Sequence, residues 1–455
     1  MQTTKFVDKM LFIGIYPQGL RAEKALITAI FFLVASFHIV CNLSRQDVGA
    51  RAAALSIMEE TMGNESALQR DTLLTKLGLS DHDGTGVVNV PVHRASTILF
   101  QSSEELAKAK AHRFDKGTLF YGRFGTPDTF AFEDAIAALE GGYGSIAVPS
   151  GLAACVLPLV GMLKSGDHVL VTDSVYEPLR ATLTECLSER GVDVTFYDPS
   201  LGADLAALFT ARTRIVYAEA PGSLTFEMQD LRVLSNVTHA RGALLVCDNT
   251  WATPLYCNPI SLGADIVVHA GTKYIVGHSD AMLGIVVVKD QKHYRALRQA
   301  SNWLGYHVSP DDIFLASRGL RTLAVRMERH QQNGLALAHF LSQQPAVRRV
   351  IHPALPDCPG HAIFKRDFSG ASGLFAAVLS TSLEKATAFV DSLSLFGIGF
   401  SWGGYESLAL VCDPSHARTA TQWQERGILV RFHAGLEHQD DLLDDLATAL
   451  RVTGI

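Results

Sequence analysis

The stretch ALLVCDNTWATPLYCNPISLGADIVVHAGTKYIVGHSDAMLGIVVV, residues 243–288, decides the fold class. It contains three short runs of apolar and β-branched residues, at 243–247, 265–269 and 283–288. Four similar runs precede it, at 145–148, 168–171, 192–196 and 214–218. Short strands that alternate with longer amphipathic stretches are typical of βαβ units. We therefore expect an α/β fold with a mostly parallel, seven-stranded sheet.

Polar segments follow five of these runs directly, at 149–151, 173–176, 219–222, 248–250 and 270–273. The carboxyl ends of parallel strands meet at one edge of a sheet, and ligands of open α/β sheets bind beyond that edge. We therefore expect these segments to assemble the functional site.

The composition is that of a globular and rather apolar chain. Of its 455 residues 48% are hydrophobic and 19% are charged, which excludes a disordered protein. The net charge of −7 gives no general attraction to polyanions, so nucleic acid is not an expected partner. The seven cysteines are scattered without a C-x-x-C pair, so we expect no metal site and a reducing, cytoplasmic location.

The apolar character is strongest near the amino terminus. Residues 25–41 carry no formal charge and could form at most one weak membrane span. Met58 and Met62 offer alternative starts, and we favour the hypothesis that the working protein does not need residues 1–61. A membrane association is expected only if residues 25–41 are a genuine anchor.

The pattern changes again after about residue 321. A basic amphipathic stretch leads into the segment HPALPDCPGH, residues 352–361, and then into mixed strand and helix segments. This predicts a separate, smaller α+β domain over residues 321–455. The preceding chain divides into the extension 1–61, an N-terminal arm over 62–123 and the main α/β domain over 124–320.

Three features point to one kind of chemistry. Lys273 follows a strand, and a lysine in a dry pocket has a lowered pKa and can form a Schiff base. Asp248 ends another strand, and a buried aspartate needs a cationic partner. Ser150 and Gly151 start an apolar helix, whose free N–H groups can bind phosphate. Alone, these could be a surface lysine, a turn-capping aspartate and an ordinary helix start, but together they are what a pyridoxal phosphate (PLP) enzyme needs.

Five segments carry a more specific resemblance: HAGTKYIVGHSDAMLG (269–284), TDSVYEPLR (172–180), VCDNTWATP (246–254), FSWGGYESL (400–408) and LVRFHAGLEHQDDLLDDL (429–446). They resemble segments of the Cys/Met-metabolism family of fold-type-I PLP enzymes, in the same order along the chain. The resemblance runs from about residue 65 to the end. YEP and SWGGYESL are similar to the carbon–sulfur β-lyase branch. A fold-type-I, PLP transferase-like architecture is implied.

The resemblance implies a role for each matching residue. Lys273 would hold the cofactor and act as the catalytic base, Asp248 would keep the pyridine nitrogen protonated, and Tyr176 would stack on the ring and assist catalysis. The cofactor phosphate would be bound by four residues: Ser150, Gly151, Leu152 and Thr272.

Other matching residues concern the substrate and a neighbouring subunit. Arg431 would bind the substrate α-carboxylate, while Ser401 and Trp402 would line the substrate pocket. Tyr121 and Arg123 resemble the family's Tyr-x-Arg pair, which reaches the phosphate in a neighbouring subunit, and Tyr121 would also contact substrate there. The resemblance thus implies a homo-oligomer, a tetramer built as a dimer of dimers with shared active sites. Without it, packing or an ion pair would explain Trp402, Tyr121 and Arg431.

Two residues depart from the family pattern. Ala270 stands where many members have a phosphate-binding serine. Because alanine has no hydroxyl, the resemblance does not supply this one phosphate contact. Phe124 follows the Tyr-x-Arg pair where the β-lyase branch tends to have another arginine. The resemblance therefore does not supply a contact to the distal carboxylate of the substrate either, and the choice of substrate could differ.

The activity implied is β-elimination from a small-molecule sulfur amino acid in methionine biosynthesis, which breaks a carbon–sulfur bond and releases pyruvate and ammonia. One alternative is a γ-specific relative or a lyase for another cysteine S-conjugate. Another is a membrane-tethered interaction protein that keeps the fold without catalysis. The intact set of Lys273, Asp248 and Arg431 argues against the latter.

Overall fold

The computed structural model describes residues 68–79 and 86–455. The chain divides into two units, Met1–Gln69 and Arg70–Ile455, and the second contains both sheets. The predictions for residues 1–61, including the apolar run 25–41, lie outside the described residues. Among the described residues, no helix is long and apolar enough to cross a membrane.

The large sheet confirms the predicted fold class. Its strands differ from the predicted runs by at most one residue at either end: β1 Gly144–Val148, β2 His168–Thr172, β3 Asp193–Tyr197, β4 Thr213–Glu219, β5 Leu244–Asp248, β6 Ile266–His269 and β7 Gly284–Val288. Their spatial order is β1-β7-β6-β5-β4-β2-β3. Six strands run in one direction, and β7 lies antiparallel between β1 and β6.

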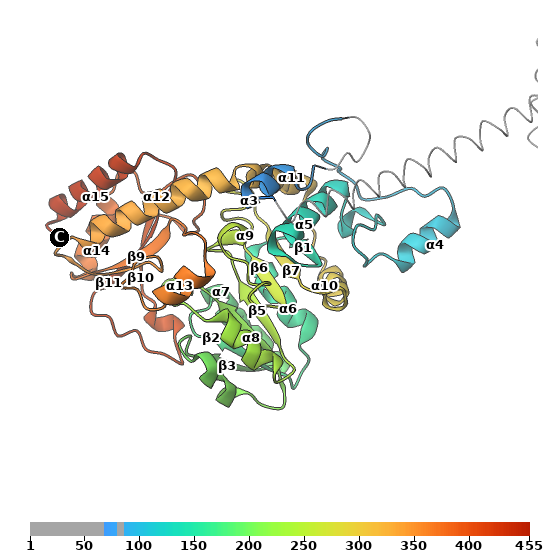
Figure 1. Ribbon diagram of the computed structural model, residues 1–455, viewed down its shortest axis with the longest axis horizontal. Helices are drawn as coiled ribbons and strands as arrows, with labels where there is room; N and C mark the ends of the chain where they lie inside the picture. The colour runs from blue at the N-terminus through green and yellow to red at the C-terminus, as the bar shows by residue number, and fades with distance from the viewer. Residues whose placement is uncertain (1–67, 80–85) are drawn as a thin grey trace, which may run out of the picture. The chain divides into compact units, whose positions relative to one another are not determined.

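Helices cover both faces of this sheet (Figure 1). Alternate residues of each strand point to opposite faces, so β1 places Ile146 in one apolar cluster and Ala147 in the other. The first cluster is completed by α6 Gly151–Met162, α7 Glu177–Thr182 and α10 Gln291–Trp303. The second includes α5 Pro127–Glu140, α8 Leu231–His239 and α11 Pro310–Arg321. Burial on both faces explains why these strands read as continuous apolar runs.

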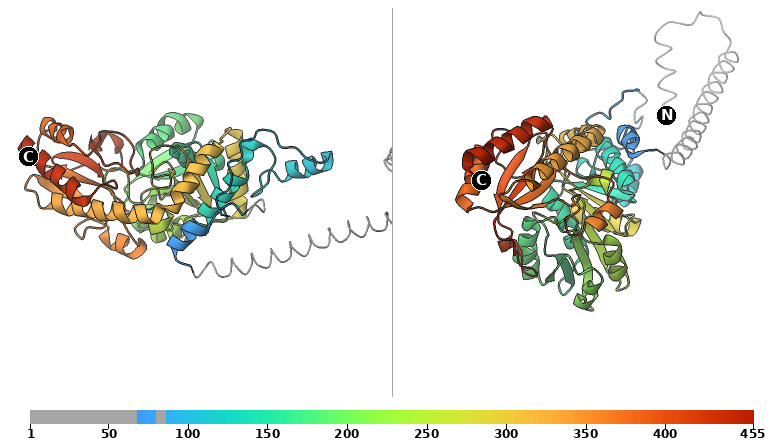
Figure 2. Two further views of the ribbon diagram at one scale, coloured as in Figure 1. Left: turned by 90° about the horizontal axis from the view of Figure 1, so that it is seen from above. Right: turned by 60° about the vertical axis from the view of Figure 1, so that its left-hand side comes forward.

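The small sheet is antiparallel, with the order β10-β11-β9-β8. Its strands are β8 Val347–Ile351, β9 Leu374–Leu379, β10 Leu408–Cys412 and β11 Ile428–His433. It shares an apolar cluster with α12 Leu323–Ser342, α14 Leu383–Ser392 and α15 Gln439–Thr453. The long helix α12 extends from α11 to α15, and so runs beside both sheets (Figures 1 and 2). The boundaries proposed at residues 123/124 and 320/321 remain predictions.

The remaining elements are short. The helices are α3 Arg70–Lys76, α4 Ser103–Ala111, α9 Thr253–Tyr256 and α13 His361–Asp367. Short segments of other helix types lie at Gly122–Phe124, Leu183–Leu187, Ser188–Arg190, Gly202–Leu208 and Ser415–Ala417.

Candidate active site

The site lies beyond the carboxyl ends of the parallel strands, where the five polar segments meet. The segment after β1 begins α6, and Ser150 caps this helix by accepting a hydrogen bond from the Ala153 N–H at 3.1 Å. At Gly151 a β-carbon would lie 2.5 Å from the Ala270 β-carbon, so the helix start and the turn after β6 are in close contact. Free N–H groups at the start of such a helix form a binding place for an anion.

Asp248 ends β5 and is 9% exposed. One carboxylate oxygen accepts hydrogen bonds from the Thr250 N–H at 2.8 Å and the Thr250 hydroxyl at 2.6 Å. The other lies 3.6 Å from the Cys155 sulfur. Every hydrogen-bond donor that the described part of the chain supplies to it is uncharged, and burial raises the pKa of this carboxyl. The position therefore suits a cationic partner from outside the chain.

Lys273 lies in the turn that follows β6, and its side chain is half-buried. Its Nζ donates a hydrogen bond to the Ser401 hydroxyl at 2.5 Å and lies 5.4 Å from the centre of the Trp402 ring. Burial, assisted by the nearby positive charge of Arg431, lowers the pKa of Lys273 to about 8. The amine is therefore far easier to deprotonate than an ordinary lysine.

Residues 401–404 pack directly on the lysine. Ser401 has a positive φ of 79°, and its carbonyl accepts a hydrogen bond from Arg431 Nη2 at 3.1 Å. At Gly403 a β-carbon would lie 2.9 Å from the Lys273 carbonyl carbon, so only glycine allows this approach. The Gly403 N–H lies 3.1 Å from Nε2 of His433, which shares a face of β11 with Arg431.

Tyr176 lies on the loop after β2, and the residue is 41% exposed. Its backbone N–H donates to a carboxylate oxygen of Glu219 at 2.8 Å. Glu219 is paired with Asp248 across β4 and β5, and burial together with the Asp248 charge raises the pKa of Glu219 well above its usual range. Burial likewise raises the pKa of the Tyr176 hydroxyl. Sequence analysis placed Glu219 among the polar segments but gave it no role.

Two of the predicted site residues, Tyr121 and Arg123, stand apart from this group, and a third, Thr272, has its hydroxyl bonded elsewhere. Among the described residues, Arg123 bonds Asn302 through both the backbone carbonyl, at 3.1 Å, and the side chain. Tyr121 is 41% exposed, and no described contact joins either residue to Lys273. The Thr272 hydroxyl is engaged with the backbone of Leu283, at 3.1 and 3.0 Å. The roles assigned to Tyr121, Arg123 and Thr272 remain predictions.

The residues of this site fit PLP. A buried aspartate without a charged partner, a lysine with a pKa of about 8 and a glycine-flanked helix start meet at one edge of the sheet. These suit a protonated pyridine nitrogen, an aldehyde and a phosphate, respectively. Leu152 is half-buried in the first turn of α6, which places its N–H with that of Gly151.

Comparisons with known proteins agree with this geometry. Residues 71–451 match the family described as Cys/Met metabolism PLP-dependent enzyme. The chain is 46% identical to a putative cystathionine beta-lyase of Rhizobium johnstonii, over 83% of this chain and 94% of the relative. It is 43% identical to the cystathionine beta-lyase of Bordetella avium, over 86% and 99%. The crystal structure of metB from Corynebacterium glutamicum superposes with a TM-score of 0.79 at 32% identity, covering 85% of this chain and 99% of that one.

Proposed function

This chain belongs to the Cys/Met metabolism family of PLP-dependent enzymes, and from this premise we propose that it is a cystathionine β-lyase. The reaction breaks the Cβ–S bond of L-cystathionine and, with one water, yields homocysteine, pyruvate and ammonia. The observation that carries the proposal is the Lys273, Ser401 and Arg431 constellation, in which Lys273 Nζ lies 2.5 Å from the Ser401 hydroxyl. Relatives that bear this name at 46% and 43% identity support it.

Each residue of the site has a task in this reaction. PLP, when bound, supplies an electron sink that stabilises negative charge at the substrate Cα. Asp248 would keep the ring nitrogen of PLP protonated, while the N–H groups of Gly151 and Leu152 would hold its phosphate. Arg431 binds the substrate α-carboxylate through its planar guanidinium. Tyr176, on the loop after β2, would stack on the cofactor ring.

Lys273 moves the proton. With a pKa of about 8, its free amine is neutral in about a tenth of molecules at pH 7, so it can take the proton from Cα. The Ser401 hydroxyl, at 2.5 Å, restrains the amine in one orientation. The same lysine, or Tyr176, then delivers a proton to the departing sulfur. Burial raises the pKa of Tyr176, which keeps its hydroxyl protonated and able to donate.

The setting of the enzyme follows from the same resemblance. We propose a homotetramer built from dimers, in which Tyr121 and Arg123 reach the phosphate of a neighbouring subunit. A cytoplasmic location in methionine biosynthesis is proposed, unless residues 25–41 act as an anchor. The described cysteines are all free thiols, which supports a reducing compartment.

The products test the proposal. Purified protein supplied with L-cystathionine is expected to release pyruvate together with a free thiol identified as homocysteine. Lys273→Ala should lower turnover by roughly 10²- to 10⁴-fold or more, because removal of the Cα proton uses this amine. Release of 2-oxobutyrate and cysteine instead would assign the chain to the γ-lyase branch. An absence of turnover with PLP bound would favour a protein that keeps the fold without the chemistry.

A further inference from the structure

Asp173 is a buried carboxylate that the reaction described above does not use. It is the first residue after β2, three positions before Tyr176, and its exposed fraction is 0%. One oxygen accepts hydrogen bonds from Arg180 Nη2 at 2.5 Å and from the Thr419 N–H at 3.0 Å. The other accepts from the Ala420 N–H at 3.1 Å. The Thr421 N–H and hydroxyl donate to it as well, at 2.8 and 2.7 Å.

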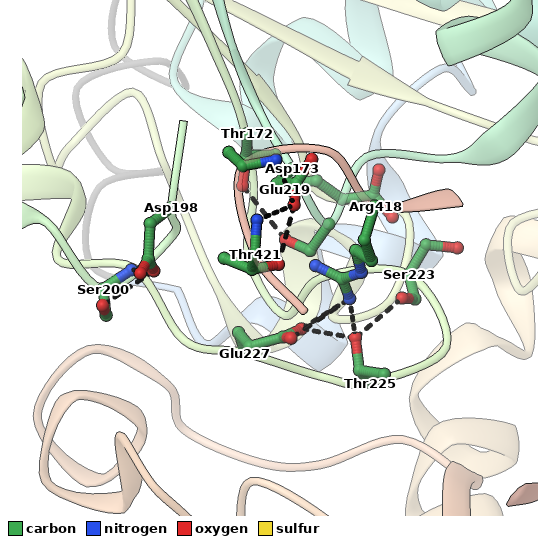
Figure 3. A network of polar contacts seen from close by, with 12 residues as sticks. Thr172, Asp173, Asp198, Ser200, Glu219, Ser223, Thr225, Glu227, Arg418 and Thr421 are labelled. Atoms are coloured by element: carbon green, nitrogen blue, oxygen red, sulfur yellow. Dashed lines mark hydrogen bonds and ion pairs between the residues drawn. The ribbon is translucent and has the colours of Figure 1, made fainter. Parts of the chain in front are cut away.

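These donors come from a different sheet. Residues 418–421 belong to the connection between β10 and β11 of the small sheet, whereas Asp173 belongs to the large sheet. Three consecutive backbone N–H groups of this connection point at a single carboxylate. Figure 3 shows Thr421 bonded to Asp173. Burial alone would raise the pKa of Asp173, but these hydrogen bonds outweigh burial and hold it below its usual value. The carboxylate is therefore ionised throughout the working pH range.

Arg418 forms a second attachment beside the first. Its side chain is 5% exposed and donates to both oxygens of Glu227, at 3.1 and 3.3 Å, and to the Thr225 hydroxyl. The Thr225 hydroxyl itself lies 2.6 Å from Glu227 (Figure 3). Both partners lie on the loop after β4. Residues 418–421 thus bond to the loops after β2 and β4 together, and we call them the interdomain clasp.

The two loops bonded to the clasp, those after β2 and β4, lie next to residues of the proposed active site. The Ser223 N–H donates to the Ser174 carbonyl at 2.7 Å, which joins the two loops. Tyr176 is bonded to Glu219 at the end of β4, through its N–H. On its other side the clasp is followed, after residues 422–427, by β11, the strand that carries Arg431. The clasp therefore connects the groups proposed to face the cofactor ring and the substrate carboxylate.

We propose that Asp173 is a positioning residue: its carboxylate fastens the interdomain clasp, residues 418–421, to the loop of Tyr176, and so fixes the separation between Tyr176 and Arg431. This inference rests on the proposed function. It assigns Asp173 no contact with substrate or cofactor. It acts indirectly, by setting the position of a substrate bound to Arg431 relative to the cofactor ring.

Three variants of the full chain, loaded with PLP, test the proposal. Asp173→Asn keeps the size of the side chain but presents one amide donor to groups that are themselves donors. Thr421→Val removes only the hydroxyl bond. The matched control is Asp198→Asn, since Asp198 also follows a strand and accepts from a backbone N–H, at 2.8 Å from Ser200, but has no described bond to the clasp.

Two measurements are made on each variant. In limited digestion with trypsin, cleavage after the shielded Arg418 is expected to accelerate in Asp173→Asn relative to cleavage after the exposed Arg426. In steady-state kinetics with cystathionine, kcat/KM is expected to fall by roughly 10- to 100-fold, because small misplacements at a reacting centre have effects of this size. Thr421→Val should show both changes in smaller degree, and Asp198→Asn neither.

The outcomes separate the inference from the function on which it rests. If the parent enzyme does not form pyruvate, the proposed function fails, while the digestion pattern still reports on the clasp. If the parent is active but Asp173→Asn matches Asp198→Asn in both measurements, the positioning role is wrong. If Asp173→Asn does not fold, Thr421→Val decides: unchanged cleavage and kinetics would overturn the proposal.

Discussion

At the scale of single residues, the site chemistry could be predicted where a charged side chain stands at the end of an apolar strand, a position that packing alone does not explain. Lys273 and Asp248 follow apolar strands, and both lie in one site. The partners of these residues could not be predicted. The Ser401 hydroxyl reaches Lys273 across 128 positions of sequence, and the contact depends on a positive φ that no local signal demands of a serine.

The lowered pKa of Lys273 predicts how stability depends on pH. In the folded chain without PLP this pKa is about 8, against 10.5 for an ordinary lysine. Between these values the unfolded chain holds more protons, so the free energy of unfolding should rise with pH. Urea unfolding of the PLP-free protein from pH 7.5 to pH 10 should show this rise relative to Lys273→Met, which has no proton to lose. Parallel pH profiles for the two proteins would contradict the expectation.

At the scale of elements, the strands were predicted better than the contacts between distant loops. Continuous β-branched runs define a buried parallel strand almost by themselves, so all seven strands were located to within one residue. The connection between β10 and β11 gave no such signal. Its importance depends on Asp173, which lies 248 positions before Thr421, and a single sequence holds no record of that contact.

One buried ion pair joins three elements and invites a stability test. Glu133 of α5 bonds Arg298 of α10 and also accepts from the Ala147 N–H of β1, at 2.8 Å. Glu133→Ala should lower the free energy of unfolding by about 3–5 kcal/mol, because it leaves the Arg298 charge buried without its partner.

The neighbouring residue supplies the control for this test. Asp134 pairs with Lys116 at 2.9 Å, but both side chains are more than a third exposed. Asp134→Ala should therefore cost less than about 1 kcal/mol. Urea unfolding at one pH and one protein concentration compares the two variants. If the two variants lose the same free energy of unfolding, the buried Glu133 pair stabilises the protein no more than the exposed Asp134 pair, and the prediction is wrong.

At the scale of the whole molecule, the predicted site residues of one chain fall into two groups. Lys273, Asp248, Tyr176 and Arg431 lie together, whereas Tyr121 and Arg123 lie on a segment without a described contact to them. Sequence alone predicted this division only through the family resemblance. No local pattern distinguishes a residue that serves its own chain from one that serves a neighbour.

Mixed oligomers test that division. Lys273→Ala and Arg123→Ala should each be nearly inactive alone. In a dimer of one variant with the other, one site combines an intact Lys273 with an intact Arg123 from the opposite subunit, so about half of the parent activity should return. Co-expression with two different affinity tags isolates the mixed species. Activity no higher than in either variant alone would show that Arg123 acts within its own subunit or not at all.

The close approach of Gly403 to Lys273 also has a meaning for how this protein can change over time. A β-carbon there would lie 2.9 Å from the lysine backbone, and the residue has a φ of 89°. Every one of the other amino acids is penalised twice at this position, by contact and by conformation. Any lineage that keeps the lysine in use therefore inherits this glycine with it.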